Sequence, residues 1–297
     1  MIFTNIEGLR DPYMLLDNGT YYLYGTDVKA RDWDNTTWGC YFNNSGSLTG
    51  PWQKVEDPIY VRPPHAQKQF WSPEVHKYKD AYYLFATYYS SQTNRRGTAI
   101  LKADSPTGPF VEISNGHATP AEWDCIDATL YIDPDGQPWL VFVHEWVCTD
   151  DHYGRMDVAK LSDDLTHIIS EPVEIFHAAD PAWAKCNIVD GPYPYTLPGG
   201  KLLMLWTNED ADGYCMGIAR SVDNRIDGKW TQDPEPIFKK GTVDRHPGGC
   251  GMIFTDWDGK RYMTVHSPNI PCEECCERVL LIPIEETEDN ILLQLDR

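Results

Sequence analysis

Short apolar runs, each preceded by a polar turn, recur along the chain at similar spacing. Five segments share this form: residues 17–26, 79–87, 135–143, 199–207 and 258–266. Each contains an apolar anchor, and alignment on Leu23, Leu84, Leu140, Met204 and Met263 gives spacings of 61, 56, 64 and 59 residues. The turns are rich in Asp, Asn and Gly, which tolerate the positive φ of tight hairpin turns. Each segment therefore predicts the turn and the second strand of a β-hairpin.

A second apolar stretch precedes four of these turns, at residues 12–16, 75–78, 129–133 and 252–257, and supplies the first strand. Similar turns at 46–52, 105–110 and 226–230 lead to outer strands. No segment of helical period competes with this pattern over a dozen residues. Repeated units of short antiparallel strands are typical of propeller blades. We therefore predict an all-β fold, a five-bladed β-propeller. Residues 1–297 are expected to form one domain, because a ring cannot be cut without exposing sheet edges.

The first strand of each blade lines the central channel of a propeller, so residues at its beginning converge on one mouth of the channel. In the five blades these residues are Asp11, Glu74, Asp127, Asp190 and Cys250. A single Asp before Pro or Gly is ordinary turn chemistry. Four carboxylates in register around one axis would repel one another unless they bind a cation or share protons, so the set predicts a functional site.

The second strand of each hairpin returns to the same mouth, which adds residues after the anchors as candidates. Glu145, between His144 and Trp146, stands out because it follows the apolar run 140–143, and burial raises a carboxyl pKa toward the range of a general acid. Trp71, Phe70 and Trp146 are candidate stacking platforms for a sugar. Paired carboxylates beside a groove rich in aromatic residues indicate glycoside hydrolysis.

Composition and charge restrict the partners and the compartment. The formal charge is −20 and the sequence pI about 4.7, which argues against nucleic acid and anionic membranes as partners. No run of eighteen apolar residues and no basic, apolar leader is present, so we expect neither a membrane span nor a signal peptide. Nine irregularly spaced cysteines suit a reducing compartment, and a cytoplasmic location is expected.

With these residues located, the chain resembles glycoside hydrolase family 43. The resemblance runs from Arg10-Asp-Pro-Tyr13 through Trp71-Ser-Pro-Glu-Val75, Asp127 and Asp190-Gly-Pro-Tyr193 to Gly251-Met-Ile-Phe254 and His266-Ser-Pro-Asn269. It implies a five-bladed propeller and an inverting mechanism on arabinose- or xylose-containing polysaccharides. It also implies that Asp11 is the general base and that Asp127 tunes and positions the general acid.

Two positions depart from the family pattern. The general acid is usually a Glu in Glu-Gly-Pro, and here that position is Asp190, one methylene shorter; either Asp190 or Glu145 then serves as the acid. The family often has a His near the axis that ligates a calcium or similar ion, and here Cys250 stands in its place. A hard cation such as Ca²⁺ prefers oxygen ligands to a thiolate, so either His246 takes over as the ligand or the ion is held mostly by water. Glu74 and Arg278 are expected to contact the substrate, Arg278 by the same resemblance.

The leading hypothesis is an exo-acting α-L-arabinofuranosidase that removes arabinose side groups from arabinoxylan-type oligosaccharides. The alternatives are a β-xylosidase with the same acids and a non-catalytic sugar-binding propeller. The Cys272-Glu-Glu-Cys-Cys276 cluster lacks a second Cys or His pair at zinc-site spacing, so it favours a cluster of surface thiols over a zinc knuckle.

Overall fold

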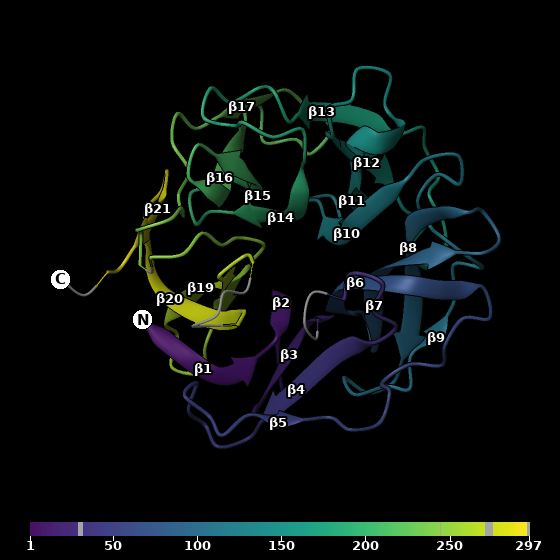
Figure 1. Cartoon of the computed structure of the whole chain (residues 1–297), viewed down its shortest axis with the longest axis horizontal. Helices are drawn as coiled ribbons and strands as arrows, with labels where there is room; N and C mark the ends of the chain where they lie inside the picture. The colour runs from purple at the N-terminus through teal and green to yellow at the C-terminus, as the bar shows by residue number, and fades with distance from the viewer. Residues whose placement is uncertain (29–31, 244, 271–275, 296–297) are drawn as a thin grey trace.

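The computed structural model describes residues 1–28, 32–243, 245–270 and 276–295. Its strands form five antiparallel sheets around a central axis, as the sequence predicts (Figure 1). All five anchors lie on second strands and are fully buried. The described residues contain no α-helix, and one short 3-10 helix, η1 (Trp146–Cys148), follows Glu145. No helix in these ranges is long and apolar enough to cross a membrane.

Four blades are four-stranded sheets and the fifth has five strands, and the inner strand of each blade begins near the axis. The first blade contains β2 (Leu9–Asp17), β3 (Thr20–Asp27), β4 (Trp38–Asn43) and β5 (Gln53–Lys54). The second contains β6 (Ala66–Tyr78), β7 (Ala81–Ser90), β8 (Arg95–Ala103) and β9 (Val111–Glu112). The third contains β10 (Cys125–Ile132), β11 (Pro138–His144), β12 (Arg155–Lys160) and β13 (Val173–His177). The fourth contains β14 (Asp190–Thr196), β15 (Leu202–Asp210), β16 (Gly213–Ser221) and β17 (Trp230–Gln232).

The fifth blade joins the two ends of the chain. It contains β18 (Ile253–Thr255), β19 (Arg261–Ser267) and β20 (Arg278–Glu286), and β20 pairs with both β1 (Ile2–Glu7) and β21 (Ile291–Leu293). The N-terminal strand thus completes the blade that the C-terminal part begins, and both termini lie beside it in Figure 1. Pairing β1 with β20 closes the ring and covers the backbone edge that β20 would otherwise expose.

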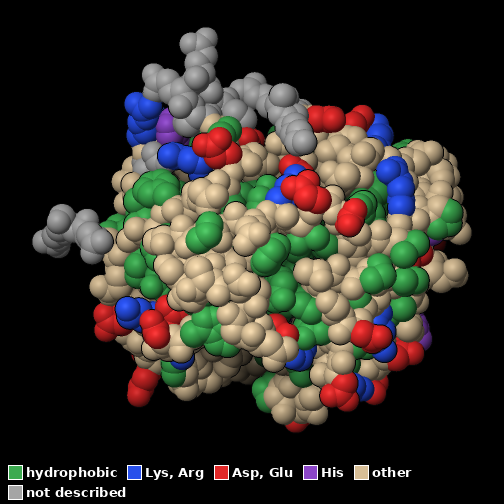
Figure 2. All heavy atoms as spheres, turned by 90° about the horizontal axis from the view of Figure 1, so that it is seen from below, with side chains coloured by type: hydrophobic (Ala, Val, Ile, Leu, Met, Phe, Trp, Pro, Cys, Tyr) green, Lys and Arg blue, Asp and Glu red, His purple; other side chains and the backbone are tan. Residues whose placement is uncertain are grey.

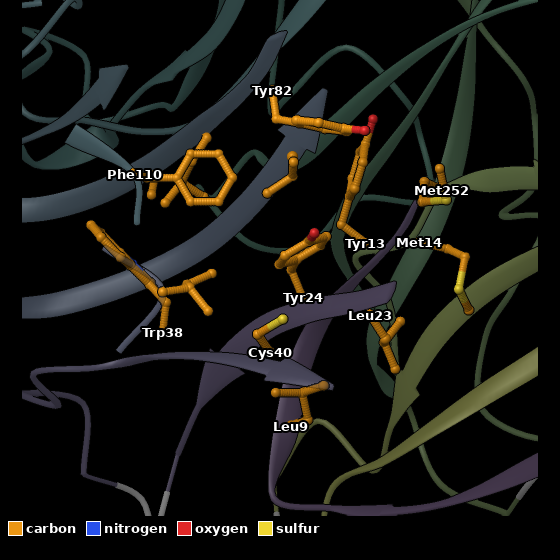
Figure 3. Packing of buried hydrophobic residues seen from close by; sticks show 14 of the residues in the cluster. Leu9, Tyr13, Met14, Leu23, Tyr24, Trp38, Cys40, Tyr82, Phe110 and Met252 are labelled. Carbon is orange, nitrogen blue, oxygen red and sulfur yellow. The ribbon is translucent and has the colours of Figure 1, made fainter. Parts of the chain in front are cut away.

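Apolar side chains fill the spaces between neighbouring blades. Leu9, Leu23 and Tyr24 of the first blade pack in one cluster with Phe110 and with Met252 before the fifth blade (Figure 3). The side chains of Trp38 and Tyr82 join the same cluster. Such packing between sheets fixes each blade relative to the next, so the inner strands hold their starting residues in a defined ring.

The molecular surface is rich in acids, in keeping with the net charge. Figure 2 shows Asp and Glu side chains interspersed with Lys and Arg over the visible face. The seven described cysteines are free thiols. Residues 271–275, which include most of the predicted cysteine cluster, lie outside the described residues, and of that cluster only Cys276 is described.

Candidate active site

Each blade carries a residue with a positive φ within its inner strand or, in the fifth blade, three residues before that strand. We call these five residues the axial ring; they are Asp11 (52°), Ser72 (45°), Asp127 (54°), Gly191 (53°) and Cys250 (42°). They lie 12 or 13 residues before the five anchors. In four blades the position coincides with a register shift between the first and second strands. The ring is therefore a repeated β-bulge, which turns the backbone at the mouth of the channel.

The bulge corrects two of the sequence assignments. The sequence placed Glu74 and Asp190 at the ring positions, but Ser72 and Gly191 occupy them. Asp190 precedes the ring by one residue, and its side chain still lines the cavity at the mouth. Glu74 follows the ring by two residues and lines the axial cavity, so its contact with the substrate stays a prediction.

Two cavities meet at the axial ring. The mouth cavity, of about 260 Å³, is lined by the predicted acids Asp11, Asp127, Glu145 and Asp190, and by Glu209. The axial cavity below it, of about 20 Å³, is lined by Tyr13 and Glu74 among others. Asp11, Ser72, Asp127 and Cys250 line both cavities. The ring therefore forms the floor of the mouth cavity, and four of the predicted acids meet above it.

Side chains three residues after the anchors hold the ring in place. In four blades this side chain accepts a hydrogen bond from the backbone amide of the next blade's ring residue. The pairs are Thr26 with Ser72 (2.7 Å), Thr87 with Asp127 (3.0 Å), Thr207 with Cys250 (3.0 Å) and His266 with Asp11 (3.3 Å). The third blade has Val143 at this position, which offers no acceptor. There the amide of Gly191 donates to the Asp127 carboxylate instead, at 3.0 Å.

Asp11 is fixed by its neighbours and opens to the cavity. The Thr26 hydroxyl donates to Asp11 Oδ2 at 2.6 Å, and His266 Nδ1 lies 3.7 Å from Oδ1. Burial, followed by the nearby Arg10, lowers the pKa of His266 to about 3, so the imidazole is neutral at physiological pH. The Thr26 hydroxyl orients the carboxyl of Asp11, whereas His266 Nδ1 accepts a hydrogen bond from the Asp11 backbone amide, so the carboxyl remains available to accept a proton, as a general base must.

Asp190 lies in an environment that favours its protonated form. Burial raises the pKa of Asp190 to about 7, although the Tyr214 hydroxyl, which donates to Oδ2 at 2.7 Å, opposes the rise. Like-charge repulsion from Glu145 and Asp11 contributes to the same rise. A carboxyl with this pKa can both hold and release a proton near neutrality, which is what a general acid requires.

Glu145 shares the cavity but has a different partner. Burial raises its pKa to about 7 as well, and the Arg96 guanidinium, whose Nε lies 2.5 Å from Oε2, lowers it. A guanidinium can only donate hydrogen bonds, so protonation of Glu145 would weaken this ion pair. Asp190, whose partner is a neutral hydroxyl, is the better placed of the two to hold a proton at rest.

Asp127 links the acids through the backbone. Burial raises its pKa well above the usual range, and the carboxyls of Asp190 and Asp11 add to the rise. The Gly191 amide that it accepts belongs to the residue next to Asp190. Asp127 therefore holds the segment that carries Asp190, in line with the positioning role that the resemblance implies.

Two tryptophans, Trp33 and Trp71, line the mouth cavity together with the carboxylates. Trp71 and Trp33 meet edge to face with ring centres 6.2 Å apart, and Trp71 Nε1 donates to the Trp33 carbonyl at 3.0 Å. The buried Arg10 guanidinium lies 4.8 Å from the centre of the Trp33 ring and donates to Asn269. All four residues line the mouth cavity together with the acids, and the two indoles give it apolar surface of the kind that sugar-binding sites use.

Three other predicted contact residues do not line the mouth cavity. Phe70 is fully buried in the core against Trp38, so the prediction that it stacks on a sugar is wrong. Trp146 is 40% exposed on η1, beyond the cavity lining. Arg278 begins the third strand of the fifth blade, where its guanidinium lies 5.2 Å from the centre of the Phe3 ring, and Arg10 is the arginine of the cavity.

Sequence reasoning did not single out Arg10, Trp33 or Tyr214, all of which line the mouth cavity. Arg10 was visible beside Asp11, because both belong to Arg10-Asp-Pro-Tyr13. Trp33 lies between β3 and β4, and Tyr214 lies on the third strand of its blade. The sequence repeat does not indicate which residues of these segments reach the mouth of the channel.

The residues near the axis do not fit the calcium ion that the resemblance implies. Among the described residues no group of three His, Cys, Asp or Glu side chains is arranged to hold a metal ion. His246 lines neither cavity. Burial, followed by the neighbouring aspartates, raises the pKa of Cys250 well above its usual value, so it remains a neutral thiol. The nearby acids already have protein donors: Thr26 for Asp11, Gly191 for Asp127, Tyr214 for Asp190 and His76 for Glu74.

The chain is similar to known glycosyl hydrolases in sequence and in fold. The sequence model described as glycosyl hydrolases family 43 matches residues 6–292. The extracellular exo-alpha-(1->5)-L-arabinofuranosidase ArbA of Cellvibrio japonicus is 23% identical over 292 residues, covering 87% of this chain and 78% of that protein. The crystal structure of an endo-arabinase from Bacteroides thetaiotaomicron VPI-5482 is 33% identical, with a TM-score of 0.82 over 96% of this chain and 98% of that one. A xylan beta-1,4-xylosidase from Bacillus halodurans C-125 shares the fold at 17% identity, with a TM-score of 0.74 over 99% of this chain and 56% of that one.

Proposed function

Because the chain belongs to glycosyl hydrolase family 43, we propose that it hydrolyses α-L-arabinofuranosyl linkages with inversion at the anomeric carbon. The observation that carries the proposal is the mouth cavity, where Asp11 and Asp190 share one space but have different partners. One is a fixed carboxylate and the other a carboxyl whose pKa burial raises to about 7. Inverting hydrolysis needs this division into base and acid.

The substrate class is supported by the two relatives with arabinan-directed names. The matched protein of Cellvibrio japonicus is named for α-(1→5)-linked arabinofuranosyl units, and the Bacteroides thetaiotaomicron structure for endo-arabinase activity. We therefore favour α-(1→5)-linked arabino-oligosaccharides as the substrate over the arabinoxylan side groups that the sequence alone suggested. Trp33 and Trp71 would take the apolar face of the sugar ring.

In the proposed reaction a water molecule attacks the anomeric carbon while the glycosidic C–O bond breaks. Asp11 takes one proton from this water, and Asp190 gives its proton to the departing oxygen. The products are arabinose of inverted configuration and a free hydroxyl, and both carboxyls return to their resting states by proton exchange with solvent. Asp127 and Tyr214 hold Asp190, and Thr26 holds Asp11, so the two groups remain oriented throughout.

The test is parallel hydrolysis of 4-nitrophenyl α-L-arabinofuranoside and 4-nitrophenyl β-D-xylopyranoside by wild type and Asp11→Asn. We expect turnover of the arabinofuranoside and a loss of about 10²–10⁴-fold in kcat in the variant. NMR of the first-formed product from arabino-oligosaccharides reports the anomeric configuration, and product length separates exo from endo action. Turnover of the xyloside alone would identify a β-xylosidase. Oligosaccharide binding without hydrolysis would identify a sugar-binding propeller.

A further inference from the structure

Tyr214 lies on β16, the third strand of its blade, yet its hydroxyl reaches the mouth cavity. The residue is 4% exposed. Its Oη lies 2.7 Å from Asp190 Oδ2 and 2.9 Å from Cys250 Sγ. Tyr214 thus connects the candidate general acid with a ring residue of the next blade.

The direction of these two hydrogen bonds follows from the protons available. A phenol can donate one hydrogen bond, and the carboxyl of Asp190 accepts that of Tyr214. The thiol of Cys250 retains its proton, because burial and the neighbouring acids raise its pKa well above the usual value. The thiol is then the donor to Tyr214 Oη, and the groups form a chain from thiol to phenol to carboxyl in which each bond polarises the next.

We propose that Tyr214, supported by Cys250, is a positioning residue that keeps the proton of Asp190 on the carboxyl oxygen facing away from Tyr214. The proposal rests on the function proposed above, in which Asp190 is the general acid. Because Oδ2 accepts the phenol proton, the proton of a neutral Asp190 resides on Oδ1. An acid that is one methylene shorter than the family's Glu has less reach, so a fixed orientation matters more for contact with the departing oxygen.

The backbone around this chain is built for the contact. Cys250 has a left-handed φ of 42°, and its amide is held by Thr207. A Cβ on Gly191 would lie 2.8 Å from Cys250 Sγ, so only glycine at this position lets the thiol approach. Gly191, the residue after Asp190, therefore packs closely against Cys250, the hydrogen-bond partner of Tyr214. A shift of either residue would displace Asp190.

The charged and titratable groups around Asp190 determine in which direction a change at Tyr214 shifts the pKa of Asp190. They are Tyr214 of β16, Glu145 after β11, Arg10 and Asp11 of β2, Asp127 of β10 and Cys250 before β18. Of these, Tyr214 and Arg10 favour the charged form of Asp190, and the acids oppose it. Loss of the phenol hydroxyl removes a stabilising donor from the carboxylate, so the protonated form persists to higher pH.

The experiment compares pH profiles of kcat/KM for wild type, Tyr214→Phe and Tyr24→Phe. Tyr24 is a matched control, because it is fully buried and its hydroxyl donates to the Pro106 carbonyl at 2.7 Å, outside both cavities. In Tyr214→Phe we expect the alkaline limb to move up by about one pH unit. We also expect kcat on arabino-oligosaccharides to fall about tenfold. KM should change little, and the loss should be smaller on 4-nitrophenyl substrates, whose leaving group needs less protonation. An unmoved limb, or an equal shift in Tyr24→Phe, would overturn the proposal.

Two further variants cover the case in which Tyr214→Phe fails to fold. Cys250→Ser retains a donor to Tyr214 and should retain the wild-type limb, whereas Cys250→Ala should move it upward by a smaller amount than Tyr214→Phe. The pKa of Asp190, followed by carboxyl ¹³C NMR, should shift in the same order without any need for turnover. A wild type inactive on both sugars with this NMR order intact would reject the proposed function alone. An active wild type without the order would reject the positioning role alone.

Discussion

The backbone amide of Gly191 donates a 3.0 Å hydrogen bond to Oδ2 of Asp127, where every other blade uses a Thr or His side chain for the equivalent contact. The exception arises because the third blade carries Val143 at the position that would accept the amide. A carboxylate of the active site thereby takes over a structural contact of the propeller. The same bond fixes the segment that begins with Asp190.

Replacement of Asp127 therefore tests orientation separately from charge. Asn retains an oxygen that can accept from Gly191, and Ala does not. We expect Asp127→Ala to lower kcat by about 100-fold and Asp127→Asn to retain more of the activity, because the neutral amide resembles the protonated carboxyl that burial favours. Steady-state kinetics on arabino-oligosaccharides checks the order. Equal losses in the two variants would show that the hydrogen bond from Gly191 does not matter for catalysis.

The identity of the general acid can be read from the leaving group. Asp190→Asn is expected to lower kcat strongly on oligosaccharides, by about 10²–10⁴-fold, and much less on 2,4-dinitrophenyl arabinofuranoside, which departs without a proton. Glu145→Gln should lower both rates by a similar, smaller factor, because its main effect is to break the pair with Arg96. Rate constants on the two substrates, measured side by side, decide the matter. The reverse pattern would assign the acid to Glu145.

The repeat in the sequence predicted most of the fold but not the start of each inner strand. The anchors are apolar and fully buried, so their spacing is visible as a pattern. The axial ring depends on backbone conformation at Asp11, Ser72, Asp127, Gly191 and Cys250, five positions that have no single side-chain type in common. An alignment that looks for acids therefore chose Glu74 and Asp190 in place of Ser72 and Gly191. Tyr214 and Trp33 reach the cavity through tertiary packing, which local periodicity does not record.

Phe70 and Trp71 are neighbours on β6, but Phe70 lies in the core and Trp71 lines the mouth cavity, which allows a paired test. Phe70 is fully buried beside Trp38, Tyr60 and Tyr88, so Phe70→Ala should cost about 3–5 kcal/mol of unfolding free energy. Trp71→Ala should instead raise KM about tenfold with a smaller loss of stability, because the indole lines the mouth cavity. Denaturant unfolding and KM measurements separate the two effects. A KM effect in Phe70→Ala at full stability would contradict the assignment of Phe70 to the core.

Removal of divalent cations is expected to leave the activity unchanged. Cys250 is a neutral thiol bonded to Tyr214, and the acids around it accept from protein donors, so the described residues offer no set of oxygens suited to Ca²⁺. We expect kcat/KM after dialysis against EDTA to differ by less than about twofold from the value with added Ca²⁺. An activity lost on chelation and restored by Ca²⁺ would show that an ion binds despite the departure at Cys250.

Asp157 predicts how stability depends on pH. It is 4% exposed, burial raises its pKa from 3.8 to about 7, and the nearest ring nitrogen of His144 lies 3.9 Å away. Burial lowers the pKa of His144 to about 4, so this imidazole is neutral and offers no charge at pH 5 or pH 8. Between pH 4 and pH 7 the folded state holds a proton on Asp157 that the unfolded state has released. The contribution to stability is therefore complete below pH 4 and is lost as pH rises through about 7.

Asp157→Asn should remove this loss. At pH 8 the wild type carries a buried charge that the variant lacks, so we expect the variant to be more stable by about 2–4 kcal/mol and to melt several degrees higher. At pH 5 the unfolded state has released its proton, but this pH lies only about one unit above the pKa of the unfolded state, so the advantage of the variant should be less than half of that at pH 8. Asp212→Asn, at an exposed position, is the control and should change neither melting temperature. A variant that melts lower than wild type at pH 8 would show that the Asp157 carboxylate has a charged partner in the folded protein.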